Sequence, residues 1–367
     1  MAAACAAALL TAGSAEAIPV PGSEAQADRF LDRAMESLVA REDGPPGAIS
    51  VVQRGGEVTV HKAGVAEVGA EGAPRKRMHM RIASTAKAMS GAVALTLVDR
   101  GVLSLDDTIG ELVPSLPAAW HPVTLRELLH HTGGIPDFTQ GPGFGPAVGA
   151  NPLNPPPPID LLGYAGTGLS PTASSYSYSN SDNIIVGLIV EAATGSSYQK
   201  EIVSLIADPL GLRRTYLYSA PTVATPYIHG YDTADPANPE DVTNEIDFGG
   251  WAWASGGVVS TPGNLNGFIR GYVGGVARKD PGDFIAGGHS EPRGPGKNAA
   301  GLALFKYEMP CGTVYGHTGS IFGFTQFMAA TADGRRSVTM SINTQYASSL
   351  LPKLRKVEER AVCAALA

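Results

Sequence analysis

The segment from Ser84 to Arg100 constrains the fold of this chain most, because its apolar residues recur so closely that a helix here leaves almost no side for water. Its large apolar residues are Met89, Val93, Leu95, Leu97 and Val98. Gly101 follows at the place where helices commonly end in a left-handed cap. We therefore expect a helix that is enclosed on all sides and lies at the centre of the molecule.

Strands are predicted near both ends of the chain. After an amphipathic helix over about 24–40, apolar stretches at 48–52 and 58–61 flank the pair Gly55-Gly56. Two glycines can adopt the positive φ angles of a tight hairpin turn, so these stretches are expected to pair. Further strands and a closing helix are expected at 314–317, 324–330, 338–342 and about 350–365.

The middle third is predicted to be mainly helical. Apolar spacing indicates helices at 123–129, 184–194 and 198–206. Between Gly141 and Pro158, glycine and proline dominate and the segment ends in four consecutive prolines, so we expect a surface loop. Strands on both sides of a helical insert imply an α+β fold. It consists of an antiparallel sheet flanked by the N- and C-terminal helices, with an inserted, mainly helical lobe.

Length and composition fit one large folded unit. The 367 residues are 44% hydrophobic, which is enough for two fused lobes around a shared cleft. We expect a single bilobed domain over 18–367, with an α/β lobe from about 18–85 and 245–367 and a helical lobe from about 86–244. The net charge is −7 and the longest basic cluster is Arg75-Lys76-Arg77, so a nucleic-acid partner is not expected.

The N-terminal segment 1–17 resembles a secretory signal peptide. An apolar run through Leu10 is followed by Ala15-Glu16-Ala17, a small-x-small cleavage pattern, although no Lys or Arg precedes the run. A disordered, Ala-rich terminus is the alternative. No other stretch approaches the ~18 apolar residues of a membrane span, so no transmembrane segment is expected. The protein is therefore predicted to be secreted, with cleavage near Ala17.

Cysteine usage agrees with export. Cleavage near Ala17 removes Cys5 and leaves Cys311 and Cys363, an even number in an oxidising compartment. One disulfide between these two residues is predicted, and a pair of buried thiols is the alternative.

Three short motifs carry the candidate chemistry: Ser84-Thr-Ala-Lys87, Tyr178-Ser-Asn180 and His317-Thr-Gly319. Each motif is weak alone, because S-x-x-K recurs at Ser197 and H-T-G recurs at His131. Ser197 is expected inside an amphipathic helical stretch with Lys200 on its solvated face. His131 is assigned to structural turn packing. The setting of Ser84 at the start of the buried helix distinguishes the first copy.

Ser84 and Lys87 are predicted to share a pocket, because residues three apart lie on the same face of a helix. A serine hydroxyl becomes a good nucleophile only when a neighbour removes its proton, and a desolvated lysine can be neutral enough to do so. The amides at the start of the helix add positive charge where the oxyanion of a tetrahedral intermediate would form.

Tyr178 and Asn180 come from an extended turn just before a predicted helix. The phenol can relay protons, but its usual pKa of about 10 means that two nearby cations would be needed to help it, and Lys87 and His317 are the candidates. The alternatives are a packed aromatic for Tyr178, a helix N-cap for Asn180 and a strand end for His317.

In combination, these motifs resemble the serine β-lactamase and penicillin-binding-protein superfamily, whose signature begins with S-x-x-K. Tyr-x-Asn together with His-Thr-Gly is similar to secreted D-alanyl-D-alanine carboxypeptidases, and class C β-lactamases share the tyrosine element. Four further segments resemble the family in family order: Arg81-Ile-Ala-Ser-Thr-Ala-Lys, Leu103-Ser-Leu-Asp-Asp, Leu128-Leu-His-His-Thr-Gly-Gly-Ile and Ser255-Gly-Gly-Val-Val-Ser-Thr-Pro. The resemblance covers nearly the whole chain after the predicted leader.

The resemblance implies a role for each motif residue. Ser84 attacks a carbonyl, Lys87 and Tyr178 move its proton, and His317 sets the local field. The backbone amides of Ser84 and Ser320 hold the oxyanion. The implied substrate-binding residues are Asn180, Trp251, Thr318, Gly319 and Ser320.

One departure concerns the leaving group. The resemblance implies an arginine for the substrate carboxylate shortly before Cys311, where this chain has Phe305-Lys306. Lysine offers a point charge rather than a planar fork. We therefore expect a D-alanyl-D-alanine carboxypeptidase-like enzyme. An esterase or amidase and a class C-like β-lactamase are the alternatives, and a catalytically inactive penicillin-binding or peptidoglycan-binding relative is an alternative of another class.

No cofactor or metal is predicted, because the eight histidines show no ligand spacing such as H-E-x-x-H. The expected partners are a small peptide, ester or β-lactam substrate and peptidoglycan. The protein is expected to be a monomer.

Overall fold

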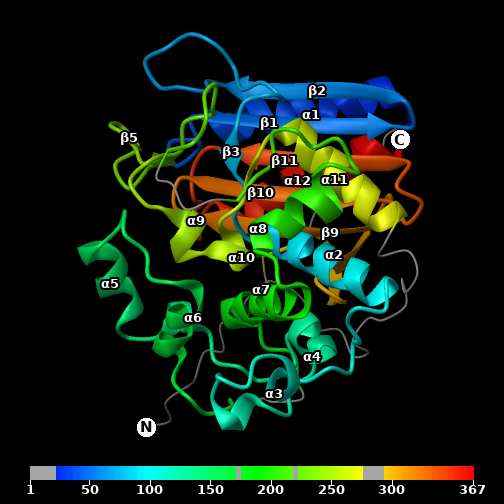
Figure 1. The fold of residues 1–367 in the computed structure, drawn as a ribbon. Helices are drawn as coiled ribbons and strands as arrows, with labels where there is room; N and C mark the ends of the chain where they lie inside the picture. The colour runs from blue at the N-terminus through cyan, green and yellow to red at the C-terminus, as the bar shows by residue number, and fades with distance from the viewer. Residues whose placement is uncertain (1–21, 171–174, 218–221, 276–292) are drawn as a thin grey trace, which may run out of the picture.

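The computed structural model describes residues 22–170, 175–217, 222–275 and 293–367 (Figure 1). The predicted signal peptide over 1–17 lies outside these residues.

A seven-stranded antiparallel sheet forms the upper part of Figure 1. In spatial order its strands are β2 (Glu57–Gly64), β1 (Gly47–Arg54), β11 (Arg336–Ile342), β10 (Phe324–Ala330), β9 (Gly312–Ile321), β8 (Phe305–Met309) and β7 (Lys297–Ala300). The predicted hairpin and the three predicted C-terminal strands are confirmed, and Gly55 has the expected positive φ of 57°. The strands β7 and β8 were not predicted from the sequence.

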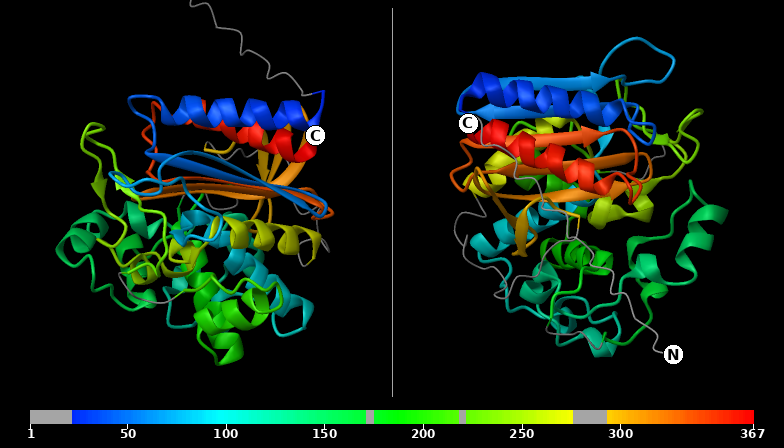
Figure 2. Two further views of the ribbon diagram at one scale, coloured as in Figure 1. Left: turned by 90° about the horizontal axis from the view of Figure 1, so that it is seen from above. Right: turned by 180° about the vertical axis from the view of Figure 1, so that it is seen from behind.

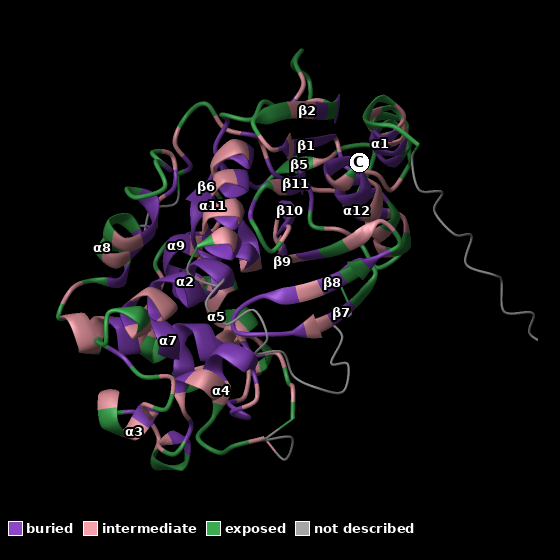
Figure 3. Cartoon of the chain, turned by 90° about the vertical axis from the view of Figure 1, so that its right-hand side faces the viewer, coloured by how far each residue is buried: buried purple, intermediate pink, exposed green. Residues whose placement is uncertain are grey.

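Helices cover both faces of the sheet. On one face, α1 (Glu24–Val39) and α12 (Leu351–Leu366) lie side by side (Figure 2). Leu31, Met35 and Leu38 of α1 are buried in the core that these two helices form with the sheet. The opposite face is covered by α11 (Pro262–Gly274) and the helical part of the chain (Figure 3). Both terminal helices were predicted, and the α+β fold class is confirmed.

The predicted central helix is present, but it begins with a tighter turn. Residues Ala83–Thr85 form a 3₁₀ turn, and α2 (Ala86–Asp99) continues from it. Ten of its fourteen residues are buried, as the apolar pattern required. Gly101 follows with a φ of 68°, which is the predicted left-handed conformation.

The remaining helices lie mostly below the sheet in Figure 1. They are α3 (Ile109–Leu112), α4 (Leu125–His130), α5 (Phe144–Ala150), α6 (Pro158–Leu161), α7 (Asn180–Thr194), α8 (Tyr198–Glu201), α9 (Phe248–Trp251) and α10 (Trp253–Gly256). Short turns of helix occur at Ala118–Trp120, Phe138–Gln140, Leu162–Ala165 and Ile202–Ala207. Two-stranded ladders join β3 (Met80–Arg81) to β6 (Val259–Ser260) and β4 (Tyr231–Asp232) to β5 (Glu240–Asp241).

Two predictions about local structure were wrong. The Gly/Pro-rich segment 141–158 contains the helix α5, which tolerates Pro146 because the first turn of a helix does not use its backbone N–H groups. Ser197 does not lie inside a helix but precedes α8 as its N-cap residue, and both Ser197 and Lys200 are exposed. This second S-x-x-K is therefore a surface feature.

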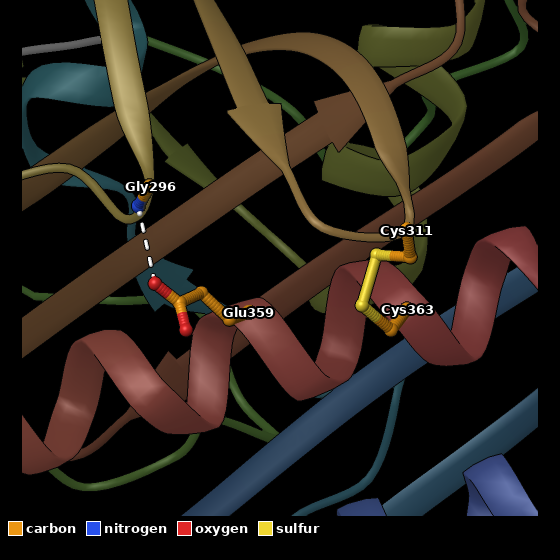
Figure 4. Close-up of a disulfide and its surroundings, with 4 residues drawn as sticks. All are labelled: Gly296, Cys311, Glu359 and Cys363. Atoms are coloured by element: carbon orange, nitrogen blue, oxygen red, sulfur yellow. Dashed lines mark hydrogen bonds between the residues drawn. A yellow bond between two sulfur atoms is a disulfide. The ribbon is translucent and has the colours of Figure 1, made fainter. Parts of the chain in front are cut away.

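The predicted disulfide joins Cys311 to Cys363, with a Cα–Cα distance of 5.5 Å (Figure 4). Cys311 lies in the turn between β8 and β9, and Cys363 lies near the end of α12. In the same region, the backbone N–H of Gly296 donates a hydrogen bond of 3.3 Å to Glu359 Oε1. The end of α12 is thus tied to the β7–β9 edge of the sheet.

Within the described residues, no helix combines the length and apolarity that a bilayer crossing requires.

We propose that the chain forms two lobes with the boundaries expected from the sequence, about 18–85 with 245–367 and about 86–244, and that the site lies between them.

Replacing both disulfide cysteines by serine should lower the free energy of unfolding by about 4 kcal/mol, because the bond closes a loop between residues 52 positions apart. Urea unfolding followed by circular dichroism measures this loss. Wild-type protein unfolded under reducing conditions should show the same decrease, and an unchanged stability in the double variant would contradict the expectation.

Candidate active site

The turn that carries Ser84 is held in an uncommon backbone conformation. The preceding residue, Ala83, is fully buried and has a φ of 52°, a left-handed conformation that costs a non-glycine residue about 1 kcal/mol. Gly319 of β9 lies directly against this turn, since a Cβ atom there would be 2.9 Å from the backbone N of Ser84. The candidate nucleophile is therefore fixed between the start of α2 and the edge of β9.

Lys87 is completely buried and its three N–H donors all have acceptors. Its Nζ lies 3.3 Å from Ser84 Oγ, 2.7 Å from Asn180 Oδ1 and 2.7 Å from the carbonyl oxygen of Ser255. Burial lowers the pKa of Lys87 to about 7, although the nearby carboxylate of Asp137 acts in the opposite direction. Near neutral pH, a large fraction of this lysine is therefore neutral and able to accept a proton.

Asn180 is oriented by a carboxylate that sequence reasoning missed. Its Nδ2 donates a hydrogen bond of 2.9 Å to Asp137 Oδ2, so its Oδ1 faces Lys87. Asn180 is the first residue of α7, and the N-cap is Ser179, whose side chain accepts a hydrogen bond from the backbone of Ser181. The N-cap alternative for Asn180 was therefore wrong.

Tyr178 lies over Lys87 and against a buried histidine. The Lys87 Nζ is 5.0 Å from the centre of the Tyr178 ring, and the ring centres of His131 and Tyr178 are 4.7 Å apart. His131 ends α4 with a φ of 58°, and its Nδ1 lies 2.6 Å from Asp182 Oδ2. His131 thus does belong to a turn, as predicted, but that turn also packs against Tyr178.

The His131–Asp182 pair lies wholly inside the protein. Burial lowers the pKa of His131 well below its usual value and raises the pKa of Asp182 well above its usual value. Both shifts favour a pair that shares one proton and carries no net charge. The ring of Tyr178 therefore packs against a His131–Asp182 pair without net charge.

His317 does not provide the second cation that the sequence suggested for Tyr178. It is 1% exposed, and burial lowers its pKa to about 3, so the imidazole is neutral at physiological pH. Its Nδ1 contacts the backbone carbonyl of Thr318. The ring of Phe305 packs edge-on against it, with ring centres 5.1 Å apart. Of the two candidates that the sequence suggested, only Lys87 can carry a positive charge beside Tyr178 at this pH.

Two cavities open on Ser84 and share Tyr178, Arg293 and Ser320 as lining residues. The larger, of about 380 Å³, also has Asn180, and the smaller, of about 210 Å³, also has Thr318 and Gly319. Most of the predicted site residues line one or both cavities: Ser84, Tyr178, Asn180, Trp251, Thr318, Gly319 and Ser320. Lys87 and His317 are buried and line neither cavity.

Trp251 forms part of the wall of the larger cavity. It is 3% exposed, its Nε1 donates a hydrogen bond of 3.1 Å to the carbonyl oxygen of Asn151, and the ring of Phe144 packs edge-on against it. The aromatic residues that line this cavity are Phe138, Phe144, Tyr178, Phe248, Trp251 and Phe322. This side of the site is therefore suited to an apolar group.

The guanidinium of Arg293, rather than the ammonium of Lys306, lies at the two cavities. Arg293 is exposed and lines both cavities, whereas Lys306 forms an ion pair of 2.6 Å with Glu308 on the same strand. The sequence analysis considered only the segment just before Cys311 and missed Arg293. No motif surrounds Arg293, so only the folded chain identifies it.

Across the part of the chain that the structure describes, no group of three or more His, Cys, Asp or Glu side chains is arranged to hold a metal ion.

Among curated proteins, the chain is 30% identical to the esterase EstB of Burkholderia gladioli over 222 residues, which are 56% of this chain and 55% of that protein. It is 28% identical to penicillin-binding protein 4* of Bacillus subtilis (strain 168), over 48% of this chain and 40% of that protein. It is 26% identical to the D-alanyl-D-alanine-carboxypeptidase/endopeptidase AmpH of Escherichia coli (strain K12), over 73% of this chain and 67% of that protein. The matches to EstB and penicillin-binding protein 4* thus span only about half of those two relatives.

Among solved structures, a D-stereospecific amidohydrolase from Streptomyces sp. superposes with a TM-score of 0.77 at 27% identity, over 92% of this chain and 98% of that one. A D-amino acid amidase from Ochrobactrum anthropi SV3 gives a TM-score of 0.76 over the same shares at 22% identity, which is a likeness of fold. The sequence profile of the family described as Beta-lactamase matches residues 28–361. With its fold and its Ser84–Lys87 geometry in agreement, this chain belongs to the Beta-lactamase family.

Proposed function

We propose that the protein is a serine hydrolase that forms an acyl-enzyme on Ser84. The contact of 3.3 Å between Lys87 Nζ and Ser84 Oγ carries this proposal, because the lysine has no exposed surface and a pKa of about 7. A buried lysine of this kind is a suitable general base for a serine hydroxyl.

In the proposed reaction, the neutral amine of Lys87 takes the proton of Ser84 while Oγ adds to the substrate carbonyl carbon. The negative oxygen that results accepts hydrogen bonds from the backbone N–H groups of Ser84 and Ser320. The proton then passes to the leaving group through Tyr178, and the bond to the leaving group breaks. Water, deprotonated by the same groups, adds to the ester and releases the acid.

The substrate class we favour is a short peptide with a free carboxylate after the scissile bond, as in a D-alanyl-D-alanine carboxypeptidase. Arg293 supports this choice, since it reaches the cavities beside Ser84 and a guanidinium pairs well with a carboxylate. Asn180 and Trp251 would hold the acyl part in the larger cavity. Thr318 and Ser320 would bind the carboxylate with Arg293.

A D-stereospecific amidase or esterase is the second candidate. The likeness to the D-stereospecific amidohydrolase and to EstB favours it, and so does the aromatic lining of the larger cavity.

We also propose that the protein is secreted, which the disulfide supports, because such bonds persist in oxidising compartments.

Purified protein should gain one covalent label per chain from a fluorophosphonate or a β-lactam, and Ser84→Ala should gain none. Intact-protein mass spectrometry measures the added mass. Equal labelling of the variant would remove Ser84 from the proposed role.

A panel of acetyl-D-Ala-D-Ala, acetyl-D-Ala amide and acetyl-D-Ala methyl ester should resolve the substrate class. For a carboxypeptidase, Arg293→Gln should lower kcat/KM on the dipeptide by about tenfold or more and leave the amide and ester nearly unchanged, because only the dipeptide has a carboxylate after the scissile bond. An equal effect on all three compounds would assign Arg293 to stability instead.

The rate should fall about tenfold for each pH unit below pH 7, because protonation of Lys87, whose pKa is about 7, removes the base. In Asp137→Asn the loss of a negative charge should lower the pKa of Lys87, so the acid limb should move to lower pH by about one unit. The pH profile of kcat/KM tests both statements. Glu57→Gln, an exposed change on β2, should leave the limb in place.

Gly319→Ala should reduce kcat by about 100-fold or more, because a Cβ atom there would be 2.9 Å from the backbone N of Ser84 and 3.0 Å from that of Thr85. The backbone of the turn must shift, and its amides would leave the oxyanion position. Gly163→Ala is the matched control, since a Cβ atom there meets nothing within 4 Å. Normal activity in Gly319→Ala with an unchanged melting temperature would contradict this account.

A further inference from the structure

The smaller cavity reaches from Ser84 to the opposite layer of the molecule. Strand β8 pairs with β9 over Gly312–Gly316, and the pairing ends before Thr318 and Ser320. The cavity lies beside this later part of β9. Its far wall is formed by Thr325 of β10 and by Leu354 and Glu358 of α12. A helix on the far face of the sheet thus contributes side chains to the candidate site.

Glu358 is the unusual member of this wall. It is 2% exposed, and it stands one helical turn after Leu354, so both residues face the same direction. A buried carboxylate is costly unless positive charge or hydrogen-bond donors surround it. Glu358 already takes part in a contact within the protein. A carboxylate has about four acceptor positions, so a group that enters the cavity can add a further hydrogen bond.

A basic and an acidic side chain therefore lie at separate points of one small space. Among the described residues that line this cavity, they are Arg293 and Glu358. Arg293 also lines the larger cavity, so it lies near the shared opening at Ser84, whereas Glu358 belongs to the smaller cavity alone. The volume of about 210 Å³ is below the roughly 300–1,000 Å³ of sites for drug-sized ligands, which suits one amino-acid-sized group.

We propose that this cavity is a leaving-group subsite for an amino acid with a basic side chain, whose carboxylate binds Arg293 and whose side-chain ammonium binds Glu358. The inference rests on the proposed acyl-enzyme function and adds a substrate class to it. Glu358 is then a specificity-determining residue. It acts on the group that is released, and the larger cavity holds the acyl part.

The test compares two dipeptides that differ only in the terminal ammonium, acetyl-D-Ala-D-Lys and acetyl-D-Ala-D-norleucine. The wild-type protein should show kcat/KM at least about tenfold higher for the lysine peptide, as expected of a charge-assisted hydrogen bond. Glu358→Gln should reduce this ratio to about one and change the norleucine rate little. Glu359→Gln is the matched control on the same helix, since Glu359 contacts Gly296, and it should keep the wild-type ratio.

A binding measurement makes the inference independent of turnover. Isothermal titration calorimetry should show D-lysine binding at least about tenfold more tightly than D-norleucine to the wild-type protein, with the difference lost in Glu358→Gln. Glu358→Asp, which keeps the charge, should retain part of the preference if the neutral variant is poorly folded. Absence of any label on Ser84 would overturn the proposed function. Equal rates and equal affinities for the lysine and norleucine compounds would overturn the subsite while the labelling result stands.

Discussion

The burial of the Lys87 ammonium group is the constraint on which the rest of the site depends. A lysine without exposed surface is stable inside a protein only when its three donors find acceptors. Here the acceptors come from the 3₁₀ turn at Ser84, from α7 and from α10. Because α7 and α10 are far from Lys87 in the sequence, the hydrogen bonds of one side chain connect three separate segments of the chain. The same burial lowers the pKa of this amine and gives it the character of a base.

Close backbone contact adds a second constraint. The 3₁₀ turn at Ser84 meets β9 at Gly319, where no side chain larger than hydrogen fits without movement. Ala83, the residue just before the candidate nucleophile, has a left-handed backbone conformation. The chain then passes through Ser84 and enters α2 at Ala86. Backbone strain and tight packing thus coincide at Ser84, the residue whose position the proposed reaction requires to be fixed.

The sequence predicts the elements with strong periodicity and the residues that lie in short motifs. The enclosed helix, the C-terminal strands and the Ser84–Lys87 pairing follow from the spacing of residues within a single segment, so no knowledge of the rest of the fold is needed. Asp137, Arg293 and Glu358 could not be predicted in this way, because each lies against a partner or a cavity that exists only after folding. The neutral state of His317 was missed for a related reason, since burial by Phe305 and its neighbours is a property of the folded chain.

The short strands β7 and β8 were missed because their local pattern is weak. In β8, Phe305, Tyr307 and Met309 alternate with charged residues over only five positions, and β7 has four residues with little apolar surface. Such strands are stabilised by the ladder beside them rather than by their own preference.

The helix α5 has consequences for how this cleft can change over evolutionary time. None of its residues is fully buried, yet Phe144 and Val148 line the larger cavity. This wall of the cavity is therefore formed by a helix on the surface of the protein. The candidate base Lys87, by contrast, belongs to the enclosed helix α2, and the candidate nucleophile Ser84 lies in the turn that leads into it. Close packing allows few substitutions there. A change of preferred substrate can therefore arise by exchange of an external segment while the candidate chemical centre stays as it is. This fits the variety of the proteins that the chain resembles, which include an esterase, a D-stereospecific amidohydrolase and a carboxypeptidase/endopeptidase.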